Sequence, residues 1–418
     1  MREMKDSGIE WVGIIPSHWI IHPVYYYFGE RKNKNKFGQE DNLLSLSYGK
    51  IIRKDINTSE GLLPESFNTY NIAEKGDIVI RPTDLQNDKR SLRTGLVRER
   101  GIITSAYICL KPIKDIDSRF FNYQLHSYDV IKVFYNMGNG VRQGLNFSEF
   151  SHLLVFEPPL DEQRRIADYL DAKCTEIDAL TADIQTQIDT LEQYKRSVIT
   201  EAVTKGLNPD AEMKDSNIQW IGMMPSHWDC IRGKYILKYI QKPVREDDGV
   251  ITCFRDGEVT LRSNRREDGF TMADKEIGYQ GIDVGDLVVH GMDGFAGAIG
   301  ISDSRGKASP VLNVLDTEQN KRYIMYFLRS MAYSDVFLAL ATGIRVRSCD
   351  LRWNKLSELF YPVPPLEEQV AIVDYIDSVL RRTDEVIAAK REQLSTLEAY
   401  KKSLIYEYVT GKKEVPLS

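Results

Sequence analysis

The spacing of hydrophobic residues changes along this chain, and two stretches repeat with the period of a long helix. Residues 160–203 contain no glycine or proline, and their apolar side chains recur every seven residues. A repeat of this kind over about four heptads predicts a helix that pairs with another helix in a coiled coil. Residues 364–413 carry a less regular apolar face, because Thr383 and Lys390 stand where the first stretch has Ile177 and Ile184. We expect the two helices to pair through the following residues: Ile177, Ile184, Ile188, Leu191 and Val198 in the first helix, and Val386, Leu394, Leu397 and Leu404 in the second.

The segments outside these helices have a different pattern. Short apolar runs rich in β-branched and aromatic residues alternate with glycine-containing and polar turns, which predicts short strands. One helix is expected late in each segment, at about 118–135 and 321–340. The predicted class is therefore α+β, with two α/β domains separated by two long helices that pair in a coiled coil. The predicted boundaries are 1–157 for the first domain, 158–206 for the first long helix, 207–363 for the second domain and 364–413 for the second helix.

The sequence contains an internal duplication. Residues 4–19 and 213–228 are identical at 11 of 16 positions, and residues 158–204 match 364–410 at 22 of 47. Between the matched segments the two halves share only short motifs, such as Gly-Asp-Ile-Val at 76–79 and Gly-Asp-Leu-Val at 285–288. A repeated frame that holds two different inserts predicts one scaffold presenting two different binding surfaces, with pseudo-twofold symmetry.

Composition excludes several classes of protein. The chain has 418 residues, is 42% hydrophobic and carries a net charge of −6, which is typical of a soluble globular protein rather than a general polyanion binder. No apolar stretch has the roughly 18 residues of a membrane helix, and the charged first residues do not resemble a signal peptide. The five cysteines form no C-x-x-C pair, so we expect no disulfide framework and no metal site, and a cytoplasmic location.

Local clusters of Arg, Lys, Asn and Gln occur in polar loops of both domains, although the net charge of residues 158–210 is −5. These side chains read phosphates and base edges, and a rigid frame could present them to a DNA groove. Polar surface loops are also common, so solvated or ion-paired residues remain an alternative interpretation. The candidate DNA-binding residues are Arg81, Thr83, Lys89, Arg90, Arg93, Arg142, Gln143 and Asn146 in the first domain, and Arg262, Asn264, Arg265, Arg266, Arg345, Arg347 and Arg352 in the second.

No catalytic motif is recognisable. The chain has no P-loop, H-E-x-x-H or G-x-S-x-G motif, and Pro209 to Lys214 only faintly resembles a nuclease motif with the wrong spacing. We interpret His18 and His227, each followed by a tryptophan in the repeated segment, as packing or capping residues. Trp11 and Trp220 are expected to be buried anchors of the repeat.

These features together resemble the specificity subunit of a type I restriction–modification system. The resemblance rests on D-S-x-I-x-W-x-G-x-x-P-x-x-W, present twice, on Gly-Asp-Ile-Val-Ile-Arg at 76–81, on P-P-L-x-E-Q before each long helix, and on the closing L-x-x-Y-[KR]-x-S. It extends over residues 1–413. It implies two target-recognition domains, each reading one half of a bipartite, asymmetric double-stranded DNA site.

The resemblance also implies partners. The two coiled-coil helices would be antiparallel, would set the unread gap and would dock two methyltransferase subunits, which bind S-adenosylmethionine and methylate adenine. Restriction–translocase subunits could join them. The specificity subunit would have no cofactor and no catalytic activity of its own. Its termini would meet, with the segment after Val409 lying near Met4.

Two other functions are compatible with parts of the pattern. A coiled-coil adaptor with two peptide-binding domains would explain the helices and the duplication but not the basic polar loops. A self-contained modification enzyme would need an adenine-methylation motif, and the Pro-Pro-Leu sequences that begin at Pro158 and Pro364 are not such a motif.

Overall fold

The computed structural model describes residues 2–57, 66–83, 85, 92–137, 144–265, 277–340 and 351–416. The chain forms two compact units: Met1–Ile184 with Glu392–Ser418, here the first unit, and Gln185–Arg391, here the second unit. Helices and strands are mixed in both, which confirms the α+β class. In the described part of the chain, no helix combines the length and the apolar character needed to cross a membrane.

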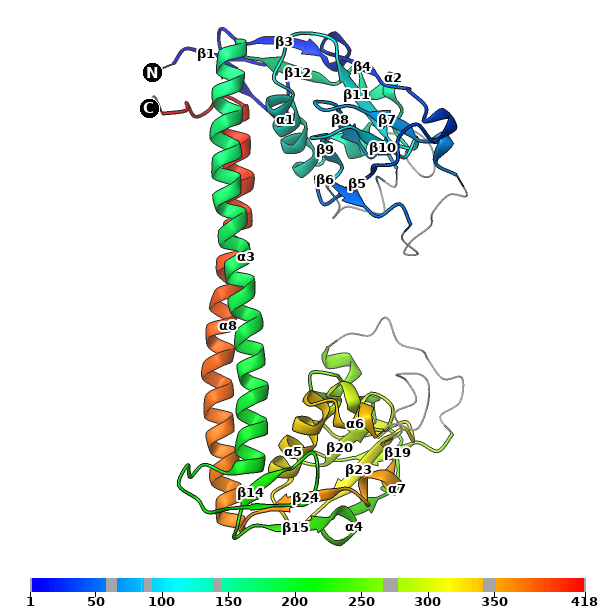
Figure 1. The fold of residues 1–418 in the computed structure, drawn as a ribbon, viewed down its shortest axis with the longest axis vertical. Helices are drawn as coiled ribbons and strands as arrows, with labels where there is room; N and C mark the ends of the chain where they lie inside the picture. Colours follow the sequence, from blue (N-terminus) through cyan, green and yellow to red (C-terminus); the bar gives the residue numbers. More distant parts are fainter. Residues whose placement is uncertain are drawn as a thin grey trace. The chain divides into compact units, whose positions relative to one another are not determined.

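Two long helices, α3 (Leu160–Lys205) and α8 (Leu366–Val409), contribute one half each to both units. They run antiparallel: Tyr169 near the start of α3 packs on Tyr408 near the end of α8, with ring centroids 4.6 Å apart. Figure 1 shows the two helices side by side in each unit. Both end just before a glycine with positive φ, Gly206 at 73° and Gly411 at 67°, as expected for helix C-termini. The predicted pair of long antiparallel helices and the internal repeat are therefore confirmed.

The seam of α3 follows the predicted heptad. Its residues Ile177, Ile184, Ile188 and Val198 are buried, and Leu191 is half-buried. In α8, Leu404 is buried, and Leu394 and Leu397 are half-buried.

Val386 is a wrong prediction, because its side chain is 45% exposed while that of Ile387 is only 2% exposed. The seam of α8 passes through Thr383, Ile387 and Lys390, so it includes the two polar residues that the prediction treated as interruptions. The Thr383 hydroxyl donates to the Val379 carbonyl at 2.8 Å, and Lys390 Nζ donates to Gln187 Oε1 at 2.5 Å.

Within its described residues, the first unit contains two four-stranded sheets and two two-stranded pairs. One sheet has the order β4-β11-β8-β9, with strands Phe28–Glu30, Ile108–Pro112, Ile78–Ile80 and Thr94–Leu96. The other has the order β6-β5-β10-β7, with strands Lys50–Lys54, Leu43–Ser47, Gly101–Ile103 and Asn71–Ala73, and its β5–β10 pair is parallel. The pairs are β1 (Met4–Asp6) with β2 (Ile14–Pro16), and β3 (Ile20–Pro23) with β12 (Leu154–Glu157). Helices α1 (Ser118–Val130) and α2 (Phe147–Phe150) complete the unit.

The second unit repeats this plan with different details. Its four-stranded sheet has the order β16-β23-β20-β21, with strands Lys238–Ile240, Leu312–Asp316, Leu287–His290 and Ile299–Ile301. The pairs are β13 (Met213–Asp215) with β14 (Met223–Pro225), β15 (Asp229–Arg232) with β24 (Phe360–Val363), β17 (Ile251–Cys253) with β18 (Val259–Leu261), and β19 (Gln280–Ile282) with β22 (Gly306–Ala308). Its helices are α4 (Gly233–Ile236), α5 (Lys321–Tyr333), α6 (Val336–Ala339) and α7 (Trp353–Leu356).

The repeated S-H-W sequence attaches each unit to the start of a long helix. Trp19 and Trp228 are fully buried, and their indole N–H groups donate to Glu162 and Glu368 at 3.3 and 3.1 Å. Nε2 of the preceding histidine lies 2.9 Å from the same carboxylate in both units. Both histidines are exposed, so they contact the carboxylate at the start of the long helix rather than packing in the interior.

The buried tryptophans are not those predicted. Trp11 is 38% exposed and Trp220 is only partly buried, so the repeat is anchored by the second tryptophan of each segment. The expected meeting of the chain ends is confirmed within the first unit: Gly411 packs on Pro16 and Trp19, and Arg2 lies 3.7 Å from Glu414.

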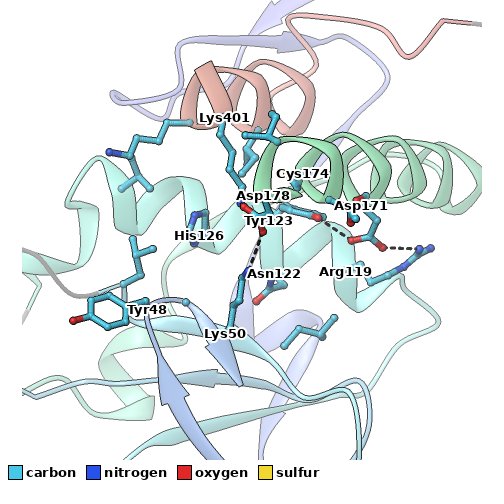
Figure 2. A pocket seen from close by; sticks show the side chains of 18 of the residues that line it. Tyr48, Lys50, Arg119, Asn122, Tyr123, His126, Asp171, Cys174, Asp178 and Lys401 are labelled. Carbon is cyan, nitrogen blue, oxygen red and sulfur yellow. Dashed lines mark hydrogen bonds and ion pairs between the residues drawn. The ribbon is translucent and has the colours of Figure 1, made fainter. Parts of the chain in front are cut away.

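A polar contact fixes α1 and α5 to the long helices. In the first unit, Arg119 on α1 pairs with Asp168 and Asp171 of α3 at 2.6 and 3.1 Å, and the Tyr123 hydroxyl donates to Asp171 (Figure 2). In the second unit, Arg322 and Tyr326 of α5 both bind Asp377 of α8. Each domain is thereby held on the side of a long helix.

Candidate nucleic-acid interface

The shared Gly-Asp motif forms a buried turn that sets the start of a central strand. The Asp77 carboxylate accepts the Glu74 backbone N–H at 2.8 Å and a hydrogen bond from Arg31 at 2.9 Å. Asp286 accepts the Asp283 N–H at 2.8 Å and binds Lys242 at 2.6 Å. Both aspartates are buried, so each needs its cation and its N–H donors to be tolerated there. The strands that follow are β8 and β20. The loop after β8 contains the predicted residues Arg81 and Thr83, and the loop after β20 begins at Gly291.

In the first unit, two predicted polar loops cross where β8 ends. The Leu145 N–H donates to the Pro82 carbonyl at 3.0 Å, which joins the loop after β8 to the segment that begins α2. Arg93 lies beneath this crossing and binds the carbonyls of Arg81 and Thr83. The structure therefore brings together residues 81–83 and 144–146, which are far apart in the sequence.

The second unit has the same crossing. The Leu351 N–H donates to the Gly291 carbonyl at 2.8 Å, and Leu351 and Gly291 match Leu145 and Pro82 by their place in the repeat. Gly291 packs closely on the Val311 carbonyl, and Arg352 stands beside it. Arg352 is exposed at the start of α7, so this predicted residue does lie at a loop crossing.

The prediction for Arg93 is wrong. Arg93 was predicted as a DNA-binding residue, but it is fully buried and its guanidinium has no exposed surface to offer a phosphate. Its donors are used inside the unit. The other described candidates of the first unit remain accessible: Arg81 and Thr83 are half-buried, and Asn146 is exposed. Asn146 also caps α2, since its side chain and that of Glu149 form a reciprocal capping box.

A second group of predicted residues lies on or just after the β17–β18 hairpin of the second unit. Arg265 is held by Asp256 and Glu258 at 2.6 and 3.0 Å and lies over the Phe254 ring, 4.2 Å from its centroid. Asn264 donates to Thr260 at 2.9 Å, and Arg262 to Thr252 at 3.4 Å.

Arg255 connects this hairpin to the loop after β20. It pairs with Asp293 at 3.0 Å, although sequence analysis selected neither residue. The position of Arg255 in the turn between β17 and β18, close in sequence to the polar cluster at 260–266, could have identified it as a candidate.

Several predicted residues lie outside the described part of the chain: Lys89, Arg90, Arg142, Gln143, Arg266, Arg345 and Arg347.

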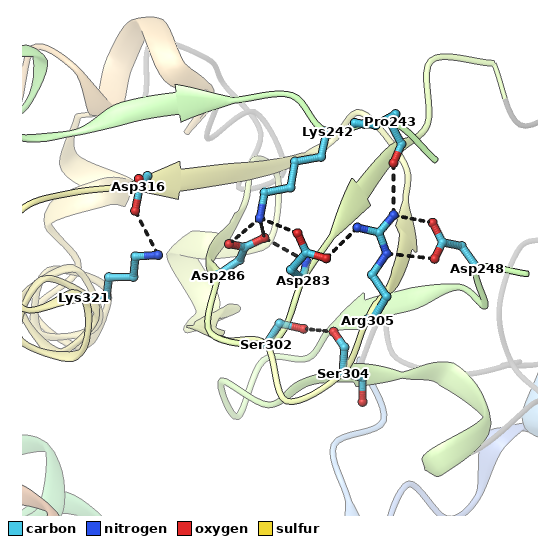
Figure 3. Close-up of polar contacts among 10 residues, drawn as sticks. All are labelled: Lys242, Pro243, Asp248, Asp283, Asp286, Ser302, Ser304, Arg305, Asp316 and Lys321. Atoms are coloured by element: carbon cyan, nitrogen blue, oxygen red, sulfur yellow. Dashed lines mark hydrogen bonds and ion pairs between the residues drawn. The ribbon is translucent and has the colours of Figure 1, made fainter. Parts of the chain in front are cut away.

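An ion network joins three loops of the second unit. Lys242 binds Asp283 and Asp286, and Arg305 binds Asp283 and Asp248 at 2.6 and 2.9 Å (Figure 3). Hydrogen bonds from Lys242 and Arg305 lower the pKa of Asp283 to about 2. Asp283 therefore stays ionised at neutral pH, and the network ties three loops together. Among the described residues, no group of three or more His, Cys, Asp or Glu side chains is placed to hold a metal ion.

Known proteins resemble this chain over most of its length. A family model described as "Type I restriction modification DNA specificity domain" matches residues 28–190. The chain is 22% identical over 429 residues to the putative type I restriction enzyme MjaX specificity subunit of Methanocaldococcus jannaschii, covering 97% of this chain and 96% of that protein. It is 24% identical over 335 residues to the MjaVIII specificity subunit of the same organism, covering 76% of this chain and 75% of that protein.

The fold is also found among solved structures. A chain from a study of complex assembly and conformational transition of the type I R-M system superposes with a TM-score of 0.65 at 14% identity, covering 96% of this chain and 99% of that one. At this identity the likeness concerns the fold alone. The family match, the two relatives and the shared fold, with its repeated frame and paired long helices, make this chain similar to type I restriction–modification specificity subunits.

Proposed function

We propose that this chain is the DNA-recognition subunit of a type I restriction–modification complex and reads a bipartite, asymmetric site. Residues 1–157 and 207–363 would be the two target-recognition domains, each reading one half-site. The observation that carries this proposal is the duplicated loop crossing, at Pro82–Leu145 in one unit and Gly291–Leu351 in the other. The frame is the same in both units while the side chains around the crossing differ, which suits recognition of two different sequences.

The chemistry of these loops suits a DNA groove. Arg352 and Asn146 are exposed at the two crossings, and arginine and asparagine are the side chains that pair with guanine and adenine edges. The net charge of −6 is compatible with DNA binding, because phosphate contacts need only local cations and partner subunits add basic surface.

The remaining parts would organise the complex. Residues 158–206 and 364–413 would set the unread gap between the half-sites and dock two methyltransferase subunits. Those subunits would bind S-adenosylmethionine and methylate adenine, while this chain itself is the non-catalytic specificity component. Restriction–translocase subunits would join the same assembly. The thiols of Cys109 and Cys253 form no disulfide, which fits a reducing cytoplasm.

A methylome tests this proposal directly. The chain is expressed with its neighbouring methyltransferase in a host that lacks adenine methylation, and modified bases are mapped by sequencing. The expected result is N6-methyladenine in both halves of one split motif, absent when the chain is omitted. Exchange of residues 229–363, which connect the second repeated segment to α8, for the corresponding segment of a relative should change one half-site only. Absence of methylation with a folded, cofactor-bound methyltransferase would overturn the proposal.

A further inference from the structure

We propose that Arg93 and Asn313 are positioning residues that hold the two loop crossings and so determine base discrimination, each in one half-site. This inference rests on the proposed function. Neither residue would contact DNA; each would act through backbone carbonyls beneath the crossing in its own unit.

Arg93 is an unusual residue for a protein interior. It is fully buried, and a buried charge is costly unless its donors are satisfied. Its guanidinium donates to the carbonyls of Arg81, at 3.3 Å, and Thr83, and to the Tyr135 hydroxyl at 3.0 Å. It also lies over the Tyr135 ring, 5.1 Å from the centroid. An apolar side chain would fill the space without this cost, so its specific contribution is the hold on the loop after β8.

The Arg93 backbone extends this connection. Its N–H donates to the Asp129 carboxylate at the end of α1, and its carbonyl accepts the Arg81 N–H at 2.8 Å. Because Leu145 bonds Pro82, between the two carbonyls that Arg93 holds, the position of the second loop depends on the first. Arg93 therefore connects the loops to α1: its side chain holds the loop after β8, and its backbone N–H binds Asp129 of α1.

Asn313 has the corresponding role at the crossing of the second unit. Its side chain is buried in β23, and its amide donates to the carbonyls of Val289 and Leu351, both at 3.1 Å. These carbonyls belong to the end of β20 and to the segment that enters α7, the two sides of the second crossing. Arg93 precedes β9 and binds two carbonyls of the loop after β8, whereas Asn313 belongs to β23 and binds one carbonyl on each side of the second crossing. The two crossings are therefore supported by unrelated side chains.

Such support matters because base readout depends on geometry. A recognition side chain needs to be held within about 0.5 Å of its productive position by the residues behind it. Exposed arginine and asparagine side chains at the crossings would keep their chemistry without Arg93 or Asn313 but would lose their fixed direction. The expected effect is relaxed specificity rather than loss of binding.

The test measures discrimination in each half-site separately. The complete methyltransferase complex is prepared with Arg93→Met, which keeps an unbranched flexible side chain, or with Asn313→Leu, which keeps the branching at Cγ; both substitutions remove the donors. Methylation rates are measured on oligonucleotides that carry the full site or a single mismatch in one half. Arg100→Met and Asn208→Leu are matched controls. Arg100 is an exposed residue paired with Glu40 and Glu74. Asn208 is exposed in the segment between α3 and β13.

We expect Arg93→Met to reduce discrimination against mismatches about tenfold in one half-site, within the range of one lost base contact, and Asn313→Leu to do so in the other half-site. The unaffected half-site shows in each case that the complex is folded. Tyr135→Phe, which removes one acceptor of Arg93 and keeps the ring, should give a smaller change in the same half-site as Arg93→Met. It provides the readout if Arg93→Met does not fold.

Unchanged discrimination in folded variants, or an equal loss in both half-sites, would overturn this inference. Failure of the proposed function looks different, because the unsubstituted complex would then show no split methylation motif at all.

Discussion

Asp178 on α3 forms an ion pair with Lys401 on α8 at 2.5 Å, and the same pair occurs again in the second unit as Asp384 with Lys195 at 2.6 Å. The matching residues are 206 positions apart, the offset of the internal repeat. Each pair joins an acidic residue beside the seam to a lysine within it. The antiparallel register of the two helices is therefore specified twice by the same pair of residues, once in each unit.

Reversal of one charge should weaken the helix pair, and reversal of both should restore it. Asp178→Lys places three ammonium groups together, because Lys50 also binds Asp178 at 2.9 Å. We expect the free energy of unfolding to fall by about 1 kcal/mol, a modest effect because solvent screens these half-exposed side chains. Asp178→Lys with Lys401→Asp should recover most of the loss in thermal denaturation.

The control for this exchange is the Lys173–Glu176 pair on the same helix, which lies on its solvent side at 2.7 Å. Its reversal should leave the midpoint of thermal unfolding unchanged. If the double exchange at Asp178 and Lys401 were no more stable than the single substitution, the ion pair would not contribute to helix pairing.

Adjacent residues of α8 should respond very differently to truncation. Ile387 is 2% exposed and Val386 is 45% exposed. Ile387→Ala removes buried methyl groups and leaves a cavity, so we expect a loss of about 2–4 kcal/mol in the free energy of unfolding. Val386→Ala should change it by less than about 0.5 kcal/mol. Urea denaturation of the two variants provides the measurement, and equal losses would contradict the observed seam.

The α8 seam shows what the sequence pattern could and could not predict. Heptads of isoleucine in α3 identified that helix and its buried face directly. In α8 the seam contains Thr383 and Lys390. The prediction treated these polar residues as interruptions and therefore selected Val386 instead of its buried neighbour Ile387. Lys390 is tolerated there because its long side chain reaches Gln187 at the edge of the seam, a contact between residues 203 positions apart.

The candidate interface was predictable only in part. The sequence indicated the polar loops, and the structure brings residues 81–83 and 144–146 together. It could not show that Arg93 points inward, because an arginine in a polar loop is normally exposed and its burial depends on carbonyls supplied by other segments. Asn313 escaped notice for the same reason, since its partners Val289 and Leu351 carry no side-chain signal for hydrogen bonding.

The ion network around Asp283 should make stability depend on pH in the acid range. Hydrogen bonds from Lys242 and Arg305 lower the pKa of Asp283 to about 2, below the value of about 3.9 for an unfolded chain. A lowered pKa means that the stabilisation is complete above about pH 4 and is lost as the pH falls towards 2. Asp283→Asn should therefore lower the thermal midpoint at pH 7, and the difference from the unsubstituted chain should shrink between pH 4 and 2.

Asp247→Asn serves as the control, since Asp247 is an exposed residue of the neighbouring loop. It should follow the unsubstituted chain at every pH. A constant difference between Asp283→Asn and the unsubstituted chain down to pH 2 would show that the carboxylate's charge does not stabilise the second unit.

Gln163 and Gln369, the last residues of the P-P-L-x-E-Q motif, should each stabilise one unit. Both side chains are fully buried. Gln369 accepts the Asn320 N–H before α5 at 2.9 Å and donates to the Pro364 carbonyl at 2.8 Å. Leucine would leave these buried groups without a partner, at about 1–3 kcal/mol for each. We expect Gln369→Leu to lower the free energy of unfolding by about 2–3 kcal/mol.

The location of the effect tests the explanation. In hydrogen exchange, Gln369→Leu should increase the exchange of amides at the start of α5 and leave α1 protected. Gln163→Leu should do the reverse, because Gln163 accepts the Asp117 N–H before α1 at 2.9 Å. Gln393→Leu, at an exposed position of α8, should affect neither helix. An increase spread equally over both units would mean that the motif stabilises the long helices rather than the attachment of each domain, because only the attachment is local to one unit.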